Sequence, residues 1–436
     1  MDSIKIYQHD GIGKIKPMHA TNNGPVYKLG VEQQITNIDA FKSAGIPYIR
    51  THDTSFYAAY GGEHTVDVHA IFPDFDKGPY DAGSYDFTVT DNYMKVMACS
   101  GAKVFYRLGS KIEHGVKKYG TLPPKDFKKW AVICEHIIRH YTEGWAEGFD
   151  YDIDYWEIWN EPDLDPDDSE NKRTWGGTKK QFFEFYNIAA KHLKDCFPHL
   201  KIGGPAIAYN LDWLKDFLTQ LTAPLDFCSW HIYASEPQAV ADRAKAVRKL
   251  LDDNGFKNTE SILNEWNYVK GWSGEEWKYS VKTIKSKKGA AFTASVMCVC
   301  QDLPVDMLMY YDARPATMNG MFYTDLVCEL LKGYYPFKMF NDVYKRKKEI
   351  KCEVSGTDIY AISAADEAGK TGTLIVYYTD EEDMPPKQLV FESESELHSA
   401  KAYLLDGEKD CLCIGGINSG DIIKMQPNTV LLITEE

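Results

Sequence analysis

The amino-acid sequence predicts an α/β fold, a (β/α)8 TIM barrel with an appended C-terminal antiparallel β-sandwich. Two observations support this fold class. Strand-like and helix-like segments alternate eight times within about 340 residues, and parallel strands require such crossover helices. Beyond Val343 the pattern changes to short alternating segments separated by turns. We expect a barrel at residues 1–342, of which 1–13 can join the sandwich, and the sandwich at 343–436.

The first half of the chain supplies four of the barrel strands. Between them, apolar residues recur at helical spacing, as at Trp130, Ile133 and Ile137. Gly45 ends one helix, and Pro162 ends the fourth strand. The expected strands are 14–20, 46–52, 103–108 and 154–162, and the expected helices are 31–44, 91–99 and 126–141.

The second half repeats the alternation before the sandwich begins. No G-x-G-x-x-G follows the first strand, which argues against a doubly wound nucleotide-binding sheet. The expected helices are 179–196, 211–221, 238–253, 290–300 and 326–340, and the expected barrel strands are 201–204, 226–231, 261–265 and 307–311. In the sandwich, the expected strands include 358–362, 373–378, 388–391, 401–405 and 430–434.

Composition narrows the classes of partner. The net charge is −15, and no basic cluster is interleaved with aromatic residues, so we expect no nucleic-acid partner. The longest weakly apolar run, 290–300, is too short to cross a bilayer, and the N-terminus lacks the apolar core of a signal peptide. We expect a cytoplasmic protein without a membrane partner, although a secreted protein trimmed of its signal peptide would look the same.

Cysteine and histidine spacing gives no sign of a metal or cofactor. The close cysteine pairs, 298/300 and 411/413, have C-x-C spacing, which favours buried free thiols over a zinc or redox site. The acidic loop 163–168 lacks EF-hand spacing, and His64 and His69 have no third ligand. We therefore expect neither a metal site nor a cofactor.

Candidate functional residues stand where the barrel strands end, because the chemistry of this fold is located at the carboxyl ends of its strands. We expect strand two to supply His52 and Asp53, strand four Asn160 and Glu161, strand six His231 and Tyr233, strand seven Glu265, and strand eight Tyr311 and Asp312, with Arg314 just beyond.

Two of these residues form a candidate catalytic pair. Glu161 and Glu265 each end an apolar strand beside tryptophan and asparagine, on opposite sides of the barrel mouth. Two carboxyl groups about 5–5.5 Å apart suit a retaining glycosidase. Glu161 would protonate the leaving oxygen, with its pKa raised by the charge of Glu265, which would attack the anomeric carbon. Asn160 would hydrogen-bond the sugar 2-hydroxyl, while the histidines and Tyr233 would hold other hydroxyls or orient Glu265.

Five motifs, in this order, resemble glycoside hydrolase family 39 over roughly residues 15–340. They are 48–52 (YIRTH), 156–162 (WEIWNEP), 203–206 (GGPA), 230–233 (WHIY) and 264–267 (NEWN). The resemblance implies a (β/α)8 barrel with an appended β-sandwich, and a carbohydrate substrate of the kind that β-xylosidases and α-L-iduronidases cleave. It also implies that Glu161 is the acid/base and Glu265 the nucleophile.

Two segments that bear on the choice of substrate depart from the sequence pattern of the family. Both the insertion 56–87 and the end of strand eight, 310–314, would line the pocket. A xyloside is the expected substrate, while arabinosides, galactosides and uronides remain open; an iduronide would call for a basic residue such as Arg314 or Lys111. The insertion could wall the cleft into a pocket, which favours exo action.

Each interpretation has an alternative. The protein could bind sugars on the same fold without turnover. His52 could be a core histidine, and Asp312 and Arg314 could simply pair with each other. The Phe/Tyr-rich insertion makes a homo-oligomer plausible.

Overall fold

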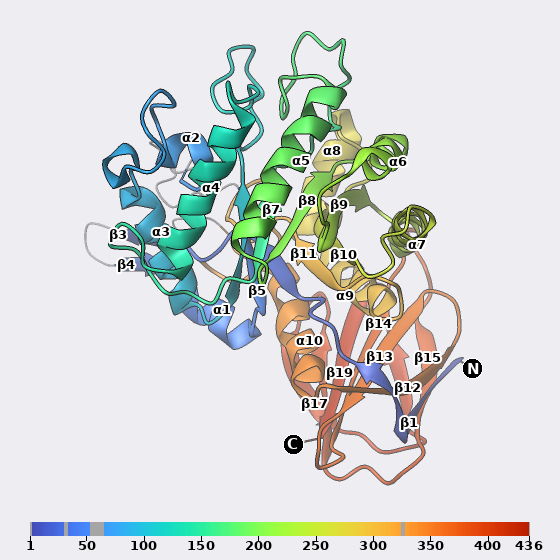
Figure 1. The fold of residues 1–436 in the computed structure, drawn as a ribbon. Coiled ribbons are helices and arrows are strands. Elements are labelled where there is room, and N and C mark those ends of the chain that lie inside the picture. The colour runs from blue at the N-terminus through green and yellow to red at the C-terminus, as the bar shows by residue number, and fades with distance from the viewer. Residues whose placement is uncertain (1, 30–33, 53–64, 324–327, 436) are drawn as a thin grey trace.

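The computed structural model describes residues 2–29, 34–52, 65–323 and 328–435. Eight parallel strands close into a barrel, which lies above a nine-stranded sheet in Figure 1. The predicted barrel with a C-terminal β domain is therefore confirmed. In chain order the barrel strands are β2 (Ala20–Asn22), β5 (Tyr48–Thr51), β6 (Lys103–Leu108), β7 (Tyr155–Ile158), β8 (Lys201–Ile207), β9 (Phe227–Ala234), β10 (Glu260–Tyr268) and β11 (Met307–Tyr310).

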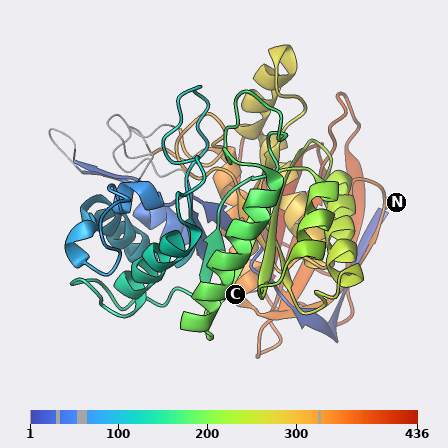
Figure 2. The same ribbon diagram turned by 45° about the horizontal axis from the view of Figure 1, so that its top comes forward.

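Helices cover the outside of the barrel, and α4 and α5 lie side by side in both Figure 1 and Figure 2. The residue that precedes each of these two helices caps its N-terminus. Asp126 accepts hydrogen bonds from the first backbone N–H groups of α4, and Thr178 forms a capping box with Gln181 at α5. The helices are α1 (Ile38–Ala44), α2 (Val68–Ile71), α3 (Thr88–Cys99), α4 (Phe127–Thr142), α5 (Lys179–Cys196), α6 (Leu211–Gln220), α7 (Pro237–Asp253), α8 (Gly274–Ile284), α9 (Lys287–Gln301) and α10 (Tyr335–Lys345).

The beginning of the barrel differs from the sequence prediction. The first strand, expected at 14–20, is β2 and begins only at Ala20. Pro17 lies in the expected stretch and has no N–H to donate to a strand ladder, which is a reason for the later start. The helix expected at 31–44 is limited to α1; residues 30–33 lie outside the described residues, and β4 (Gln34–Thr36) pairs with β3 (Tyr27–Leu29).

The last barrel helix also begins later than expected. The sequence predicted a helix over 326–340, whereas α10 begins at Tyr335, after a short 3-10 turn at Lys332–Tyr334. Pro336 lies in the first turn of α10, where its missing N–H and fixed φ favour a helix start. Part of the expected segment, 324–327, lies outside the described residues.

The barrel interior is divided into an apolar and a polar layer. Alternate residues of one strand point inward, so in β7 Tyr155 and Glu157 face the interior while Trp156 joins the outer core. Tyr155 belongs to the apolar layer, which comprises Ala20, Phe105, Tyr155, Phe227, Ile262, Met307 and Met309. Toward the carboxyl ends of the strands the interior becomes polar. The fully buried polar residues there are Asn22, Arg50, Glu157, Ser229 and Asn264.

The C-terminal part is one curled, mixed sheet in the order β17-β16-β19-β14-β13-β12-β1-β15-β18. The expected antiparallel pairing is interrupted once. The N-terminal strand β1 is antiparallel to β12 but parallel to β15. The strands are β1 (Asp2–Lys14), β12 (Lys348–Ser355), β13 (Ile359–Ala365), β14 (Thr371–Tyr377), β15 (Lys387–Ser393), β16 (Ala400–Leu405), β17 (Asp410–Gly416), β18 (Ile422–Met425) and β19 (Thr429–Glu435).

This sheet has two apolar faces, because side chains alternate along its strands. In β14, Leu374 and Val376 belong to the same core as the barrel helices, whereas Ile375 and Tyr377 belong to a second core within the sheet. The sheet is therefore packed directly onto the barrel. None of the helices in the described ranges is both long and apolar enough to cross a bilayer. Cys298 and Cys300 are buried free thiols, as expected, whereas Cys411 is half-buried and Cys413 is exposed.

Candidate active site

The end of β7 presents Asn160 and Glu161 through an unusual backbone. Trp159 and Glu161 have φ angles of 75° and 49°, in the left-handed region that non-glycine residues seldom adopt. Such residues cost on the order of 1–3 kcal/mol each and persist where surrounding contacts fix them. Here Trp159 N donates to Leu108 O at 2.7 Å and Glu161 N to Ala206 O at 2.8 Å. The neighbouring barrel strands therefore hold both residues at the mouth.

Packing holds the same turn from the other side. The Trp159 ring is buried, and its indole N–H donates to Thr174 O at 2.8 Å. Gly109 packs against it with φ 134°, and a Cβ there would lie 3.0 Å from the ring. The hydroxyl of Thr174 donates to Glu161 O at 2.6 Å. These contacts account for the tryptophan beside the Asn-Glu pair in the sequence.

A bulge in β10 directs two successive residues into the barrel. The register of β10 against β9 shifts between Leu263 and Glu265. Asn264 consequently points inward and donates to Glu157 at 2.5 Å, Glu265 follows it into the pocket, and Trp266 packs in the outer core. Bulges re-aim side chains in this way near active sites. The sequence gives no sign of this bulge.

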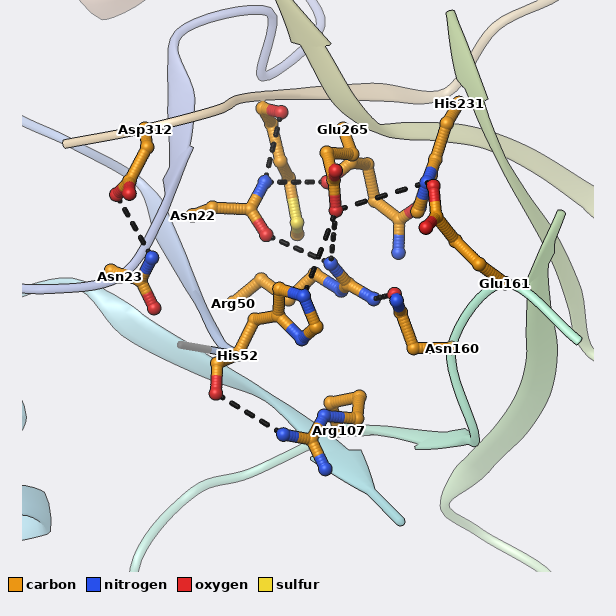
Figure 3. A network of polar contacts seen from close by, with 12 residues as sticks. Asn22, Asn23, Arg50, His52, Arg107, Asn160, Glu161, His231, Glu265 and Asp312 are labelled. Carbon is orange, nitrogen blue, oxygen red and sulfur yellow. Dashed lines mark hydrogen bonds and ion pairs between the residues drawn. The ribbon is translucent and has the colours of Figure 1, made fainter. Parts of the chain in front are cut away.

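The two glutamates meet across His231 (Figure 3). His231 Nδ1 lies 2.8 Å from Glu161 Oε1 and 3.7 Å from Glu265 Oε2. One carboxylate oxygen of each glutamate and a ring nitrogen of His231 all lie within 4.8 Å of one another. Inverting glycosidases need carboxyl groups about 6.5–9.5 Å apart to admit a water molecule, whereas retaining enzymes need about 5–5.5 Å. The observed separation fits direct attack by one of the carboxylates.

Arg50 is the main functional residue that the sequence analysis missed. Its guanidinium is fully buried and donates to Asn160 Oδ1 at 2.6 Å, Asn22 Oδ1 at 2.9 Å and Glu265 Oε2 at 3.3 Å (Figure 3). Its Nε donates to Glu157 Oε2 at 2.8 Å. Arginine is almost never fully buried unless it is paired, so an arginine inside the predicted barrel strand 46–52 was the available signal.

Glu157 anchors this network below the pocket. Its second oxygen accepts from Ser229 Oγ at 2.6 Å and from Asn264 Nδ2 at 2.5 Å. The Arg50–Glu157 ion pair is inaccessible to solvent on both sides. A buried ion pair requires additional hydrogen bonds to offset its desolvation, and Glu157 has them. Arg50 can therefore hold Glu265 and Asn160 at fixed positions.

The charge states of the site follow from burial and neighbours. Burial raises the pKa of Glu265 to about 7; the charge of Glu161 acts in the same direction, while His231, Arg50 and the Tyr233 hydroxyl oppose it. Burial also lowers the pKa of His231 to about 4, despite the nearby charge of Glu265. His231 is therefore neutral at pH 7.

Three further predicted residues line the pocket. Tyr233 donates to Glu265 Oε1 at 2.6 Å, and His52 Nε2 lies 3.9 Å from Glu265 Oε2. Tyr311 lies beside both, with ring centroids 6.4 Å from each. His52 is thus close to the reacting groups, although Arg107 also holds its carbonyl at 3.1 Å.

The other three predicted substrate-binding residues do not line the pocket within the described part of the chain. Asp53 lies outside the described residues. Asp312 is buried, accepts from Asn23 Nδ2 at 2.9 Å and forms an ion pair with Arg314 at 3.1 Å. Neither Asp312, Arg314 nor Lys111 lines the part of the pocket that the structure describes. The pairing of Asp312 with Arg314 is the alternative considered from the sequence.

The pocket at the barrel mouth has a volume of about 730 Å³. Of the insertion, residues 65–87 contribute nothing to the described pocket wall; Asp67 instead binds Arg107 at 2.6 Å, behind His52. The described wall also includes residues that the sequence analysis did not single out. They come from segments after strands three to seven, Arg243 from α7 and the others from loops. They include His114, Arg173, Tyr209, Arg243 and Trp272.

Two groups of described side chains have the spacing of metal ligands. One is Glu161, His231 and Glu265; the other, on α4 and α5, is Glu135, His192 and Cys196. In the first group, Arg50 places a fixed positive charge beside Glu265. In the second, Glu135 is already paired with Arg139 and His192, at 2.9 and 2.7 Å. The mechanism proposed below uses Glu161 and Glu265 as acid/base and nucleophile and routes no step through a metal at either group.

The closed barrel, with glutamates toward the carboxyl ends of its fourth and seventh strands, defines the class of (β/α)8 glycosidases. Within this class the chain belongs to the glycosyl hydrolases family 39, whose family model matches residues 13–315.

Curated relatives match part of the chain. It is 26% identical over 288 residues to a beta-xylosidase of Geobacillus stearothermophilus, covering 55% of this chain and 51% of that protein. It is 30% identical over 165 residues to a beta-xylosidase of Caldicellulosiruptor saccharolyticus, covering 35% and 32%. The matched part therefore spans about half the length of these relatives, or less.

Solved structures match the whole chain. A glucosidase from Croceicoccus marinus superposes with a TM-score of 0.80 at 20% identity, covering 100% of this chain and 98% of that one. A monomeric beta-xylosidase from Caulobacter crescentus gives 0.70 at 16% identity, covering 100% and 99%. At these identities the similarity shows the fold alone.

Proposed function

We propose that this protein is a retaining, exo-acting glycoside hydrolase that removes β-xylosyl residues by double displacement. The observation that carries the proposal is the approach of the Glu161 and Glu265 carboxylates to within 4.8 Å across His231. At that separation one carboxylate can reach the anomeric carbon while the other reaches the glycosidic oxygen.

In the first step, protonated Glu161 gives its proton to the leaving oxygen while ionised Glu265 attacks the anomeric carbon. The bond to the leaving group breaks and a glycosyl–Glu265 ester forms. In the second step, Glu161 takes a proton from water, the water oxygen attacks the same carbon, and Glu265 leaves as the carboxylate. Two inversions give net retention.

The contacts of Glu265 support this assignment of roles. Arg50 and the Tyr233 hydroxyl both donate to Glu265, and hydrogen bonds to a carboxylate favour its ionised form. The pKa of Glu265 is about 7 partly because of the charge on Glu161. Once Glu161 holds the proton this repulsion disappears, so the pair sharing a single proton favours ionised Glu265.

Asn160 is placed to bind the sugar 2-hydroxyl. Its Oδ1 accepts from Arg50 at 2.6 Å, which fixes the amide orientation and makes Nδ2 the group available to a ligand in the pocket. An amide N–H donated to the 2-hydroxyl gains strength as charge develops on the sugar in the transition state.

The choice of a xyloside rests on the relatives. Two curated relatives are named beta-xylosidases, and the chain shares their family. Exo action is proposed because the site is a pocket; residues 56–64 of the insertion after the second strand lie outside the described residues. Arabinosides, galactosides and uronides are the competing substrates.

The test is hydrolysis of 4-nitrophenyl β-xyloside, α-arabinoside, β-galactoside and β-glucuronide by the wild type, Glu161→Ala and Glu265→Ala. We expect turnover of the xyloside above the others, and loss of most of it in both variants. Turnover of another sugar would replace the substrate and keep the mechanism. No turnover of any sugar, with binding of a free sugar retained, would make the protein a sugar-binding protein.

A further inference from the structure

A short segment of the C-terminal sheet reaches two active-site strands. It follows β14 and begins with Tyr378, which is buried and donates its hydroxyl to Ser235 O. Ser235 lies two residues after Tyr233, the side chain that donates to Glu265. The C-terminal sheet therefore contacts the barrel two residues after Tyr233, although Tyr378 and Ser235 lie far apart in the sequence.

Asp380 makes the second connection, to the end of β10. Its carboxylate accepts from Tyr268 Oη at 2.6 Å, Lys270 Nζ at 2.9 Å and Lys288 Nζ at 2.9 Å. The Asp380 side chain is only 8% exposed. Burial acts to raise its pKa, but these three donors outweigh burial and lower it, so Asp380 is ionised near neutral pH. Charge-assisted hydrogen bonds of this kind are the stronger ones in proteins.

The segment that Asp380 holds leads directly to the pocket. Tyr268 lies three residues after Glu265, and Trp272 lies two residues after Lys270. Trp272 lines the pocket, packs edge-on against Tyr233 with ring centroids 4.9 Å apart, and is 60% exposed. An exposed ring that still lines the pocket stands at its mouth. Its position there is suited to the part of a ligand that protrudes from the reacting centre.

The second partner of the Trp272 ring comes from α8. Trp277 stacks on it with centroids 5.5 Å apart and planes inclined by 20°. The sheet also holds α8, since Glu382 accepts from Tyr279 Oη at 2.8 Å. Both supports of the ring are therefore tied to the same segment of the C-terminal sheet.

We infer that Asp380 is a positioning residue through which the C-terminal sheet holds Trp272 over the leaving-group end of the pocket. The ligand that Trp272 would take there is the flat apolar face of an aryl group or of a second sugar ring. This inference rests on the proposed function. It assigns to the C-terminal sheet a part in leaving-group recognition rather than in the chemical step.

The test compares two substrates with the same sugar and different leaving groups, a 4-nitrophenyl glycoside and the matching glycosyl fluoride. In Asp380→Asn we expect KM for the aryl substrate to rise by about three- to tenfold, the range for loss of an aromatic contact. For the glycosyl fluoride, KM and kcat of Asp380→Asn should each stay within about twofold of the wild-type values. Lys270→Ala is the milder second variant, because Lys270 is half exposed and its removal leaves Asp380 with two donors.

A double-mutant comparison separates positioning from general destabilisation. Trp272→Ala should reproduce the aryl-specific rise in KM, and Asp380→Asn added to Trp272→Ala should cause little further change. Glu435→Gln is the matched control: Glu435 is a buried carboxylate of the same sheet that accepts from Thr371 and His398, away from the pocket. It should lower stability without separating the two substrates.

Equal effects of Asp380→Asn on both substrates, or full additivity with Trp272→Ala, would overturn the inference while leaving the proposed function intact. Failure of the wild type to cleave either substrate would instead count against the proposed function. In that case tryptophan emission decides the inference, because Asp380→Asn should alter the spectrum of the wild type and leave that of Trp272→Ala unchanged.

Discussion

The guanidinium of Arg50 lies 3.3 Å from the carboxylate of Glu265, and both side chains are buried at the carboxyl end of the barrel. Arg50 is itself paired with Glu157 at 2.7 Å, so its position does not depend on the ligand. A permanent positive charge thus faces the residue that must remain an anion for attack. This arrangement makes Arg50 a part of the catalytic machinery that can be tested directly.

Arg50→Gln should lower kcat/KM by about a hundredfold or more, the usual scale for a positioned electrostatic contact. It should also destabilise the fold by about 3–5 kcal/mol, because Glu157 becomes an uncompensated buried charge. Steady-state kinetics and urea unfolding measure the two effects. Arg139→Gln, at a partly exposed pair on α4, is the control and should change stability by less than about 1 kcal/mol. Normal activity in Arg50→Gln would exclude the role given to it.

The roles of the two glutamates are distinguished by azide rescue. In Glu265→Ala, azide can enter the vacated space and attack the anomeric carbon, so the product should be a glycosyl azide of inverted configuration. In Glu161→Ala, azide should replace water in the second step and give a retained product. Proton NMR of the products reads the configuration. A retained azide from Glu265→Ala would mean that the roles are reversed.

Most of the barrel could be predicted because its elements are long and regular. The predicted bounds of α5 and β6 agree with the structure, since each is a continuous helical or apolar run. The first barrel strand was misplaced because it has only three residues, too few to show a period. The single parallel pair of β1 and β15 could not be predicted either, because no local pattern records which distant strand an N-terminal segment joins.

The candidate site divides in the same way. Glu161 and Glu265 were visible because each ends a predicted apolar strand, and the structure brings both to the pocket. Arg50 was missed as a functional residue because its partners, Glu157 and Glu265, lie on other strands. Trp272 lies in a loop, where no sequence period marks it. Its ring reaches the pocket through its contact with Tyr233, which only the structure shows.

The acid limb of the pH profile should report Glu265. Attack requires ionised Glu265, so kcat/KM should rise with pH along this limb. The limb should lie below pH 7, because the pKa of about 7 includes the charge of Glu161, which holds its proton in the reacting state. The Tyr233 hydroxyl lowers this pKa, so Tyr233→Phe should move the limb to higher pH. Tyr209→Phe, at an exposed position on the pocket wall, is the control and should leave the limb in place. A limb that moves to lower pH in Tyr233→Phe would contradict the assignment.

Stability should also depend on pH through Glu349 in β12, away from the pocket. Glu349 is buried and accepts from Gln301 Nε2 at 2.8 Å, and burial raises its pKa to about 7. The folded protein therefore binds this proton more tightly than the unfolded chain does. The resulting stability is fully present below the unfolded pKa, near 4.5, and is lost as pH rises through about 7.

Glu349→Gln replaces the carboxyl by a neutral group of the same shape and should remove this dependence. At pH 8 the variant should be more stable than the wild type by about 1 kcal/mol, a value reduced for partial solvent screening, and at pH 4.5 the two should be equal. Urea unfolding at both values measures the difference. Glu353→Gln, on an exposed side chain of the same strand, is the control. A variant less stable than the wild type at pH 8 would show that the charged form of Glu349 is the one that the fold favours.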